Sequence, residues 1–311
     1  MILPTNRRLA KLPYLKTFLA DCPNAVVGWG RKLSGRRAEW VARLLRRPLA
    51  LLEDGFVRSF ERGAATRSII VDDLGVYYDA RSRSRMEQVI AQGVGDAQAE
   101  RARFLIAAWQ AGGISKYNHA PEYDGELPNS YVLVADQTYG DLSVSAGMAE
   151  QASFEAMLQA ALDENPNDPV LIKIHPDVLT HQTWGWISED MLTHPRIRII
   201  GDGSHPVRLL KHASAVYVVT SLIGFEALLW NRPVRCFGMP FYAGWGLTKD
   251  ALPTPHRRGQ ARLEDVVYAA FVAQARYVDP RDGALCQAEQ AISYMAEQRA
   301  LKFGFPAQTS V

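Results

Sequence analysis

The segment from Val216 to Thr248 constrains the fold more than any other part of this chain. It opens with the β-branched run VYVV at 216–219, which is typical of a short strand buried on both faces of a sheet. The polar pair Thr220 and Ser221 follows, and the apolar run from about 223 to 230 then predicts a helix. A strand, a polar turn, a helix and a second strand in this order predict an α/β crossover unit.

The turn of this unit also predicts an anion site. The first N–H groups of a helix have no intrahelical partner, and the helix dipole adds positive charge, so a phosphate could bind at Thr220 and Ser221. Glu226, one turn further on, could accept hydrogen bonds from a ribose. The alternative interpretation is a capped crossover helix with a solvated Glu226, and this segment alone does not separate the two.

Strand and helix patterns alternate along most of the 311 residues. The run NAVVGWG at 24–30, a helix at about 36–45 and the strand LALLED at 49–54 predict a βαβ opening. SIIVDD and VYYDA, separated by Leu74 and Gly75, predict a hairpin. Strands at 131–135, 170–174 and 196–200 continue the alternation, so we expect an α/β chain with mostly parallel sheets and a cleft between two domains.

The stretch NHAPEYDGELPNS at 118–130 has neither a helical nor a strand period and predicts a domain boundary. We expect an N-terminal Rossmann-like domain over 1–125 and a second Rossmann-like domain over 126–260. The last segment, 261–311, is expected to form helices that brace the N-terminal domain.

Charge and cysteine content narrow the function classes. The formal net charge of +2 and pI near 8.4 are too mild to favour a nucleic-acid partner. Cys22, Cys236 and Cys286 have no paired spacing, so the sequence predicts neither a disulfide framework nor a zinc site and favours a reducing cytoplasm. No signal-peptide pattern and no apolar run of about 20 residues is found, which predicts a soluble or peripherally attached protein.

Basic residues are instead clustered locally. Arg36, Arg37, Arg46 and Arg47 lie in two such runs, and RSRSR at 81–85 and HRR at 256–258 form others. These clusters could line an anion-binding cleft or contact acidic lipid head groups, and each is also compatible with a solvated surface.

Polar residues follow three predicted strands. Glu53 and Asp54 end the strand predicted at 49–54, and Arg58 follows it. The two acids could act in acid–base chemistry, with Arg58 holding an anion, or could cap a turn. The loop ADQTYGDLS contains Asp136, Gln137 and Asp141. One of its carboxylates could attack an electrophilic sugar carbon, while Asx-turn capping is the alternative.

The third group is KIHPD, with Lys173, His175 and Pro176. Pro176 favours an extended backbone at His175, so the imidazole would project from the strand end and could donate to a phosphate or carboxylate. A packed histidine is the alternative. The chain contains no HExxH, GxxxxGK[ST], GxSxG or GxGxxG pattern and no acidic triplet of metal-binding spacing, so we expect neither a metal nor a cofactor.

Aromatic residues surround Gly238, Gly244 and Gly246 in the loop that ends the segment from Val216 to Thr248. Phe237, Phe241, Tyr242 and Trp245 could stack on a cytosine or cover a sugar, and a packed loop is the alternative.

Eight ordered segments resemble the KpsC/LipB-type capsule polysaccharide biosynthesis proteins, which are bacterial β-Kdo glycosyltransferases. The segments are GWGRKLSGRRA, LLEDGFVRS, SIIVDDLGVYYDARSRS, VLVADQTYGDLSV, KIHPD, TSLIGFEALLW, RPVRCFGMPFYAGWGLT and ARYVDP. The resemblance implies a GT-B architecture of two Rossmann-like domains facing a central cleft, CMP-Kdo as donor and retention through a covalent glycosyl–aspartate. It also implies a lipid-linked acceptor, Kdo-terminated or phosphatidylglycerol, at the cytoplasmic face of the inner membrane.

The same resemblance implies residue roles. The nucleophile would be Asp141 or Asp136, with Asp141 preferred, and its acidic partner Glu53 or Asp54. The substrate-binding residues would be His175, Pro176, Lys173, Ser221, Thr220, Glu226, Arg58 and Gln137. The alternatives left open are another GT-B transferase or epimerase that uses a UDP-sugar, and a noncatalytic glycan-binding module.

Overall fold

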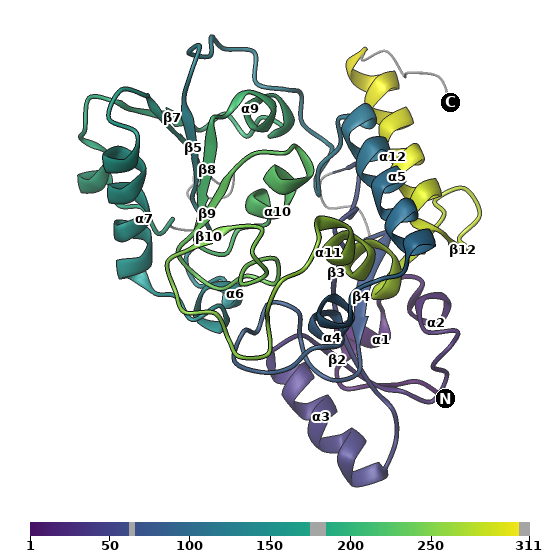
Figure 1. Cartoon of the computed structure of the whole chain (residues 1–311). Coiled ribbons are helices and arrows are strands. Elements are labelled where there is room, and N and C mark those ends of the chain that lie inside the picture. Colours follow the sequence, from purple (N-terminus) through teal and green to yellow (C-terminus); the bar gives the residue numbers. More distant parts are fainter. Residues whose placement is uncertain (62–65, 175–184, 305–311) are drawn as a thin grey trace. The chain divides into compact units, whose positions relative to one another are not determined.

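The computed structural model describes residues 1–61, 66–174 and 185–304, and the chain forms two compact units (Figure 1). Unit 1 contains Met1–Tyr77, Ser82–His119 and the chain from Glu264 onward, and unit 2 contains Tyr78–Arg81 and Ala120–Leu263. His175 and Pro176 lie outside the described residues. Each unit has its own sheet.

The sheet of unit 1 has parallel and antiparallel strands. Its order is β1 (Leu3–Pro4), β2 (Val26–Trp29), β3 (Leu49–Asp54), β4 (Ser68–Asp72), β11 (Ala275–Val278) and β12 (Leu285–Cys286). β1, β2 and β3 pair in parallel, whereas β4 is antiparallel to both β3 and β11, and β12 is antiparallel to β11. The expectation of a parallel sheet therefore holds for only the first three strands of this unit.

The hairpin predicted over 68–80 is wrong. Asp72, at the end of β4, accepts hydrogen bonds from the N–H groups of Leu74 (2.8 Å), Gly75 (2.9 Å) and Arg85 (2.8 Å). These bonds turn the chain away from the sheet toward α4 (Arg85–Gln92) instead of returning it as a second strand. β4 pairs with β3 and β11, which are distant in sequence or joined by a long loop.

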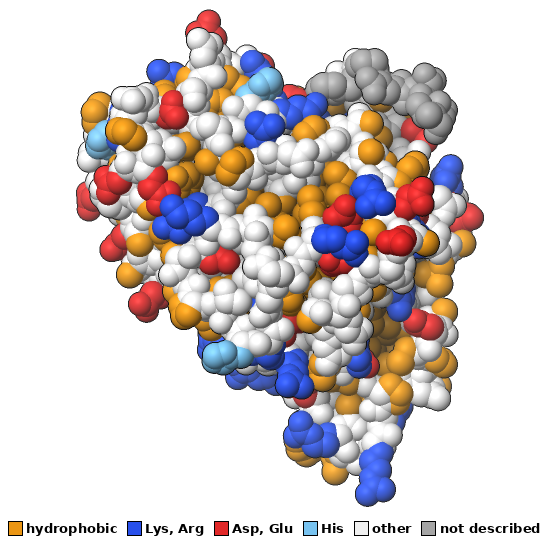
Figure 2. All heavy atoms as spheres, in the orientation of Figure 1, with side chains coloured by type: hydrophobic (Ala, Val, Ile, Leu, Met, Phe, Trp, Pro, Cys, Tyr) orange, Lys and Arg blue, Asp and Glu red, His pale blue; other side chains and the backbone are white. Residues whose placement is uncertain are grey.

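Helices cover this sheet. They are α1 (Arg7–Ala10), α2 (Leu15–Phe18), α3 (Leu33–Leu45), α4, α5 (Asp96–Gly112), α11 (Leu263–Tyr268), the π-helical turn η2 (Ala269–Ala273) and α12 (Ala288–Phe303). α3 packs closely on β2, because a Cβ at Gly28 would lie 2.6 Å from the Cα of Gly35. Arg101 of α5 forms an ion pair with Glu289 of α12 at 2.7 Å. Lys and Arg side chains and hydrophobic side chains lie together on the surface over α3, at the bottom of Figure 2.

The sheet of unit 2 is parallel throughout. Its order is β10 (Lys249–Asp250), β9 (Val234–Cys236), β8 (Ala215–Val218), β5 (Val132–Ala135), β6 (Val170–Lys173) and β7 (Ile197–Ile200). All five pairings are parallel. β5 and β8, the central pair, are apolar along almost their whole length, as expected for strands covered on both faces.

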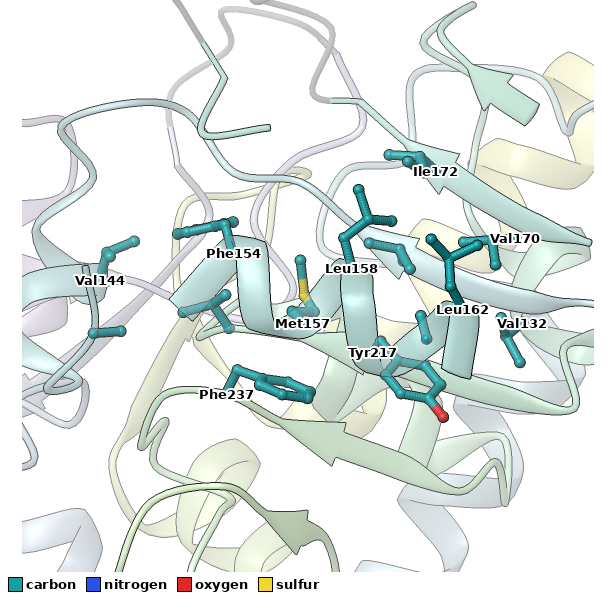
Figure 3. Packing of buried hydrophobic residues seen from close by; sticks show 14 residues of the cluster. Val132, Val144, Phe154, Met157, Leu158, Leu162, Val170, Ile172, Tyr217 and Phe237 are labelled. Atoms are coloured by element: carbon teal, nitrogen blue, oxygen red, sulfur yellow. The ribbon is translucent and has the colours of Figure 1, made fainter. Parts of the chain in front are cut away.

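The helices of unit 2 complete its core. They are α6 (Leu142–Ala146), α7 (Gln151–Glu164), the 3₁₀ turn η1 (Glu189–Leu192), α9 (Val207–His212) and α10 (Leu222–Leu229). Phe154, Met157 and Leu158 of α7 pack with Val132 of β5 and Phe237, which follows β9, in one buried cluster (Figure 3). The predicted α/β class of the GT-B type, with two Rossmann-like domains, is confirmed.

Within the described residues, no helix combines the length and the apolar composition that crossing a bilayer requires. The same part of the chain contains no group of three or more His, Cys, Asp or Glu side chains arranged to hold a metal ion.

Candidate functional site

Most of the predicted site residues of unit 2 lie at one edge of its sheet. Asp136 and Gln137 directly follow β5, Thr220 and Ser221 follow the neighbouring β8, and Lys173 ends β6 on the other side of β5. Parallel strands present their carboxyl ends at the same edge, where α/β proteins bind ligands. The structure therefore brings together five residues that come from three separate segments of the sequence.

A network of side chains joins β5 to β8. The Nε2 of Gln137 donates to the Oγ1 of Thr220 at 3.0 Å, and the backbone N–H of Thr220 donates to the Oε1 of Gln137 at 2.9 Å. The hydroxyls of Ser143 and Thr220 are 3.2 Å apart. Gln137 and Thr220 are buried, so these bonds satisfy polar groups that would otherwise lose water without compensation. Ser143 belongs to the same ADQTYGDLS loop as Gln137.

Asp136 holds a neighbouring segment of backbone. Its Oδ1 accepts hydrogen bonds from the N–H groups of Trp186 (3.1 Å) and Ile187 (3.3 Å). The side chain is only 7% exposed, and burial raises the pKa of the carboxyl to about 6, although these backbone hydrogen bonds act in the opposite direction. Asp136 is therefore a buried carboxyl that titrates closer to neutrality than an ordinary aspartate.

Asp141 is placed differently. It is exposed, and it caps α6 at its N-terminus, where its Oδ1 accepts from the N–H of Ser143 at 2.9 Å. Gly140, with φ of +82°, makes the turn that precedes this cap. The capping interpretation that the sequence left open for one of the two aspartates thus describes Asp141, whose exposed carboxylate is also accessible to a ligand.

Lys173 lies among acidic residues. Its Nζ donates to the carbonyl of Ser204 at 2.7 Å. Burial lowers the pKa of the Lys173 ammonium, and the nearby carboxylates of Asp202, Glu122 and Glu226 raise it. The hydroxyl of Ser204 is buried and has no hydrogen-bond partner within 1–61, 66–174 and 185–304. Lys173 therefore places a hydrogen-bond donor at the sheet edge with carboxylates nearby.

His205 is a site residue that the sequence reasoning missed. Its Nδ1 lies 2.9 Å from the Oε1 of Glu122, and the N–H of Arg208 donates to the Oε2 of Glu122 at 2.9 Å. His205 is followed by Pro206, the same His-Pro signal that drew attention to His175, so the pattern could have found it. His205 is almost completely buried, so its pairing with the Glu122 carboxylate indicates a structural role.

Ser221 begins α10. Its hydroxyl accepts from the N–H of Ile223 at 3.3 Å, and Ser221 remains partly exposed. Glu226, one turn further, is 3% exposed. Ser221 therefore caps α10, as the alternative interpretation expects. The solvated Glu226 of that interpretation is wrong, because the Glu226 side chain is buried.

The remaining predicted residues belong to unit 1. Glu53 and Asp54 end β3, and the Oδ2 of Asp54 lies 3.0 Å from the Nε of Arg58. The Arg58 guanidinium lies over the ring of Tyr117, 5.5 Å from its centroid. Asp54 and Arg58 thus form an ion pair in unit 1, and Glu53 precedes Asp54 at the end of β3.

The aromatic loop after β9 is packed. Phe237, Phe241, Tyr242 and Trp245 are all buried, and the Nε1 of Trp245 donates to the carbonyl of Phe241 at 2.8 Å. The structure favours the packing interpretation of this loop over stacking on a base. A different aromatic group lies beside the site: Tyr139 is 59% exposed, and its ring centroid is 4.7 Å from that of Trp186.

The sequence matches the family model described as "Capsule polysaccharide biosynthesis protein" over residues 24–120 and 105–279. The chain is 37% identical over 321 aligned residues to the capsule polysaccharide modification protein LipA of Neisseria meningitidis serogroup B, a match that covers 94% of this chain and 45% of LipA. It is 35% identical to the lipopolysaccharide-processing protein LpsZ of Rhizobium meliloti, covering 91% of this chain and 66% of LpsZ. The chain thus spans about half the length of LipA.

Two solved structures of KpsC from Thermosulfurimonas dismutans are similar to this chain. The structure described as the β Kdo 2,4 transferase has a TM-score of 0.87 and 34% identity, covering 95% of this chain and 97% of that one. The structure described as the β Kdo 2,7 transferase has a TM-score of 0.66 and 28% identity, covering 88% and 84%. The similarity to the first extends over nearly the whole of both chains.

Proposed function

Because this chain belongs to the capsule polysaccharide biosynthesis protein family, we propose that it transfers Kdo from CMP-Kdo to a lipid-linked acceptor with retention of configuration. The observation that carries this proposal is the similarity over 97% of a solved β Kdo 2,4 transferase, at 34% identity and a TM-score of 0.87. The lower similarity to the 2,7 transferase favours the 2,4 linkage for this chain. The acceptor would be Kdo-terminated or phosphatidylglycerol-based and would lie at the cytoplasmic face of the inner membrane.

The sheet edge of unit 2 supports a role in binding the donor, which is anionic at its phosphate and at the Kdo carboxylate. Thr220 and Ser221, at the start of α10, would bind the phosphate, because a helix N-terminus favours negative charge. Lys173 would pair with the sugar carboxylate, and Glu226 would accept from the ribose. Gln137 would position Thr220 through the hydrogen bonds described above.

In unit 1, Arg58 is a second candidate for the sugar carboxylate, since its guanidinium is partly exposed. His175 and Pro176 remain predicted contacts of the donor. The start of α10 and the side chains of Lys173, Arg58 and His175 would offset the negative charge that develops on the phosphate. We therefore expect the leaving group to be stabilised without a metal.

We propose Asp141 as the nucleophile. Its carboxylate would attack the anomeric carbon of Kdo, and the bond to CMP would break with its electron pair leaving on the phosphate. The acceptor hydroxyl would then attack the glycosyl–aspartate, giving its proton to Glu53 or Asp54 and regenerating the Asp141 carboxylate. Two inversions give net retention. Asp136 is the second candidate, because it directly follows the central strand β5.

Asparagine substitutions separate chemistry from structure at both positions. Asp141→Asn keeps an oxygen that can cap α6, and Asp136→Asn keeps an acceptor for the N–H groups of Trp186 and Ile187. Asp163→Asn is the matched control, because Asp163 is an exposed acid on α7 of the same unit that accepts from Gln159 at 2.9 Å.

The test measures CMP release with CMP-Kdo and a Kdo-terminated acceptor, and intact protein mass after incubation with donor alone. We expect wild type and Asp163→Asn to turn over and to gain one Kdo in mass, and Asp141→Asn to do neither. Loss confined to Asp136→Asn would move the nucleophile to Asp136. Turnover with no adduct, or with a UDP-sugar only, would contradict the retaining CMP-Kdo mechanism, and donor binding without turnover would indicate a noncatalytic module.

A separate measurement tests the prediction that the transfer reaction needs no metal ion. We expect CMP release to continue in EDTA. Complete loss of release that a divalent ion restores would contradict it.

A further inference from the structure

One face of α3 combines exposed apolar side chains with arginines. Leu33, Trp40 and Leu44 are 84%, 61% and 64% exposed. Arg36, Arg37 and Arg43 are also exposed. At 3.6 residues per turn, these six side chains fall within an arc of about 120°. We call them the α3 face.

The opposite side of α3 explains why this face points outward. Ser34, Gly35, Ala38 and Ala42 are buried against β2. Small residues there bring the helix backbone close to the sheet, as the 2.6 Å approach at Gly28 shows. Burial of the small residues leaves the large apolar residues of the same helix on the surface. This is the reverse of an ordinary amphipathic helix, in which the large apolar side chains form the core.

Positive charge is concentrated at this helix. Residues 31–47 contain seven arginines or lysines and one acid, whereas the whole chain carries a formal charge of only +2. The acid, Glu39, is already paired with Arg31 at 2.7 Å. Arg36, Arg37 and Arg43 form no ion pair with any residue that the structure describes. Their charge is therefore available to a negatively charged partner outside the chain.

A hollow of about 570 Å³ adjoins the N-terminal end of the α3 face. Leu9, Leu12, Trp29 and Leu33 line it, together with Arg8 and Lys32. The hollow therefore combines apolar and basic side chains, as the α3 face does, but on a concave surface.

We propose that the α3 face binds the surface of an anionic lipid bilayer. Trp40, Leu33 and Leu44 would enter the boundary between head groups and acyl chains, and Arg36, Arg37 and Arg43 would contact lipid phosphates. Interfacial helices have this composition, with Trp and Leu beside Arg. A protein partner would need an acidic surface with an apolar centre, whereas an anionic bilayer supplies both chemistries over a large area. The inference concerns the chain's attachment and does not depend on the proposed transferase activity.

The test is co-sedimentation of the whole chain with phosphatidylcholine vesicles that either contain or lack phosphatidylglycerol, without any sugar donor. We expect binding only to the anionic vesicles, and weaker binding at high salt because ions screen the arginines. The double substitution Arg36→Glu and Arg37→Glu should lower affinity by roughly 30-fold or more, since each cation near such a surface contributes about a fivefold gain. The triple substitution of Leu33, Trp40 and Leu44 by Ser should lower it by at least about tenfold.

Phe104→Ser with Leu301→Ser is the matched control. Both residues are exposed hydrophobics on other helices of unit 1, α5 and α12, and the control should bind as wild type does. In wild type, the Trp40 fluorescence should shift to the blue on anionic vesicles, and Trp40→Phe should remove the shift. Circular dichroism and denaturant unfolding check that every variant is folded.

Wild-type protein that stays in solution with anionic vesicles would overturn the proposal. Variants of the α3 face that sediment with vesicles as wild type does would also overturn it. If the substitutions instead caused an oligomer of the chain to dissociate, the α3 face would be a protein interface and the proposal would be wrong. None of these outcomes depends on whether CMP is released, so the failure of this inference is distinguishable from the failure of the proposed function.

Discussion

Gln137 and Thr220 join the ends of two adjacent parallel strands through their side chains and one backbone N–H. The amide of Gln137 donates to the Thr220 hydroxyl at 3.0 Å and accepts from the Thr220 N–H at 2.9 Å. Because Gln137 follows β5 and Thr220 precedes α10, this pair fixes the distance between the DQTYGD loop and the helix start proposed to bind phosphate. The hydrogen bonds between Gln137 and Thr220 therefore help to hold the carboxyl ends of β5 and β8 together.

Replacing Thr220 with Val should test this link. The substitution keeps the shape of the side chain but removes the hydroxyl, leaving the buried Gln137 amide and the Ser143 hydroxyl short of a partner. We expect the free energy of unfolding to fall by about 1–3 kcal/mol. Urea unfolding measures it, and Thr193→Val, at an exposed hydroxyl of the same unit, should change stability by less than about 0.5 kcal/mol. Equal effects of the two would contradict a structural role for the pair.

The buried carboxyl of Asp136 should make stability depend on pH. Its pKa is raised to about 6 in the folded chain by burial, from an ordinary value of 3.8, so the fold favours the protonated form. The contribution of Asp136 to stability is therefore fully present below about pH 4 and is lost as pH rises to about 6, with a total of roughly 3 kcal/mol.

The measurement is denaturant unfolding of wild type and Asp136→Asn between pH 4 and 7. The difference in stability between the two proteins should shift in favour of the Asn variant as pH rises from 4, and the change should level off as pH approaches 7. A difference that is the same at every pH in this range would show that the carboxyl titrates as an exposed aspartate does.

Trp245→Ala should affect the fold more than the donor. The indole is almost completely buried and donates to the carbonyl of Phe241, so truncation should cost about 3–5 kcal/mol of unfolding free energy. The KM for CMP-Kdo of the folded fraction should stay close to the wild-type value. A raised KM with little loss of stability would restore the stacking interpretation.

Sequence patterns predicted unit 2 more closely than unit 1, for a physical reason. A parallel strand covered on both faces is a continuous apolar run, and VLVA at 132–135 and VLIK at 170–173 stand out as such. The mixed sheet of unit 1 depends on pairing between β4 and β11, which are about 200 residues apart. No local pattern encodes that partner, and the turn formed by Asp72 reads equally well as the centre of a hairpin.

The site shows the same division. Asp136, Lys173 and Thr220 are identifiable from the sequence because each ends or follows an apolar strand, and the parallel pairing of β5, β6 and β8 then places them at one edge. The role of each side chain cannot be identified from the sequence, because it depends on whether the tertiary fold buries that side chain. Asp136 and Asp141 lie five residues apart in one loop, yet one is a buried carboxyl and the other an exposed helix cap. His205 is buried beside Glu122, and only the tertiary fold brings those two residues together.

Ser221 allows the capping role of the α10 N-terminus to be separated from its proposed phosphate-binding role. Ser221→Ala removes the oxygen that accepts from the N–H of Ile223 and should cost about 0.5–2 kcal/mol of stability, together with any hydrogen bond to the donor. Ser221→Asp keeps a capping oxygen but places a negative charge where the donor phosphate is proposed to bind. We expect this variant to be as stable as wild type and to raise the KM for CMP-Kdo by more than roughly tenfold, because like charges then lie together. Steady-state CMP release gives the KM and urea unfolding gives the stability. An Asp variant with a wild-type KM would place the phosphate away from α10. An Asp variant that is as unstable as the Ala variant would show that Ser221 is required for the stability of the α10 cap and not only for donor binding.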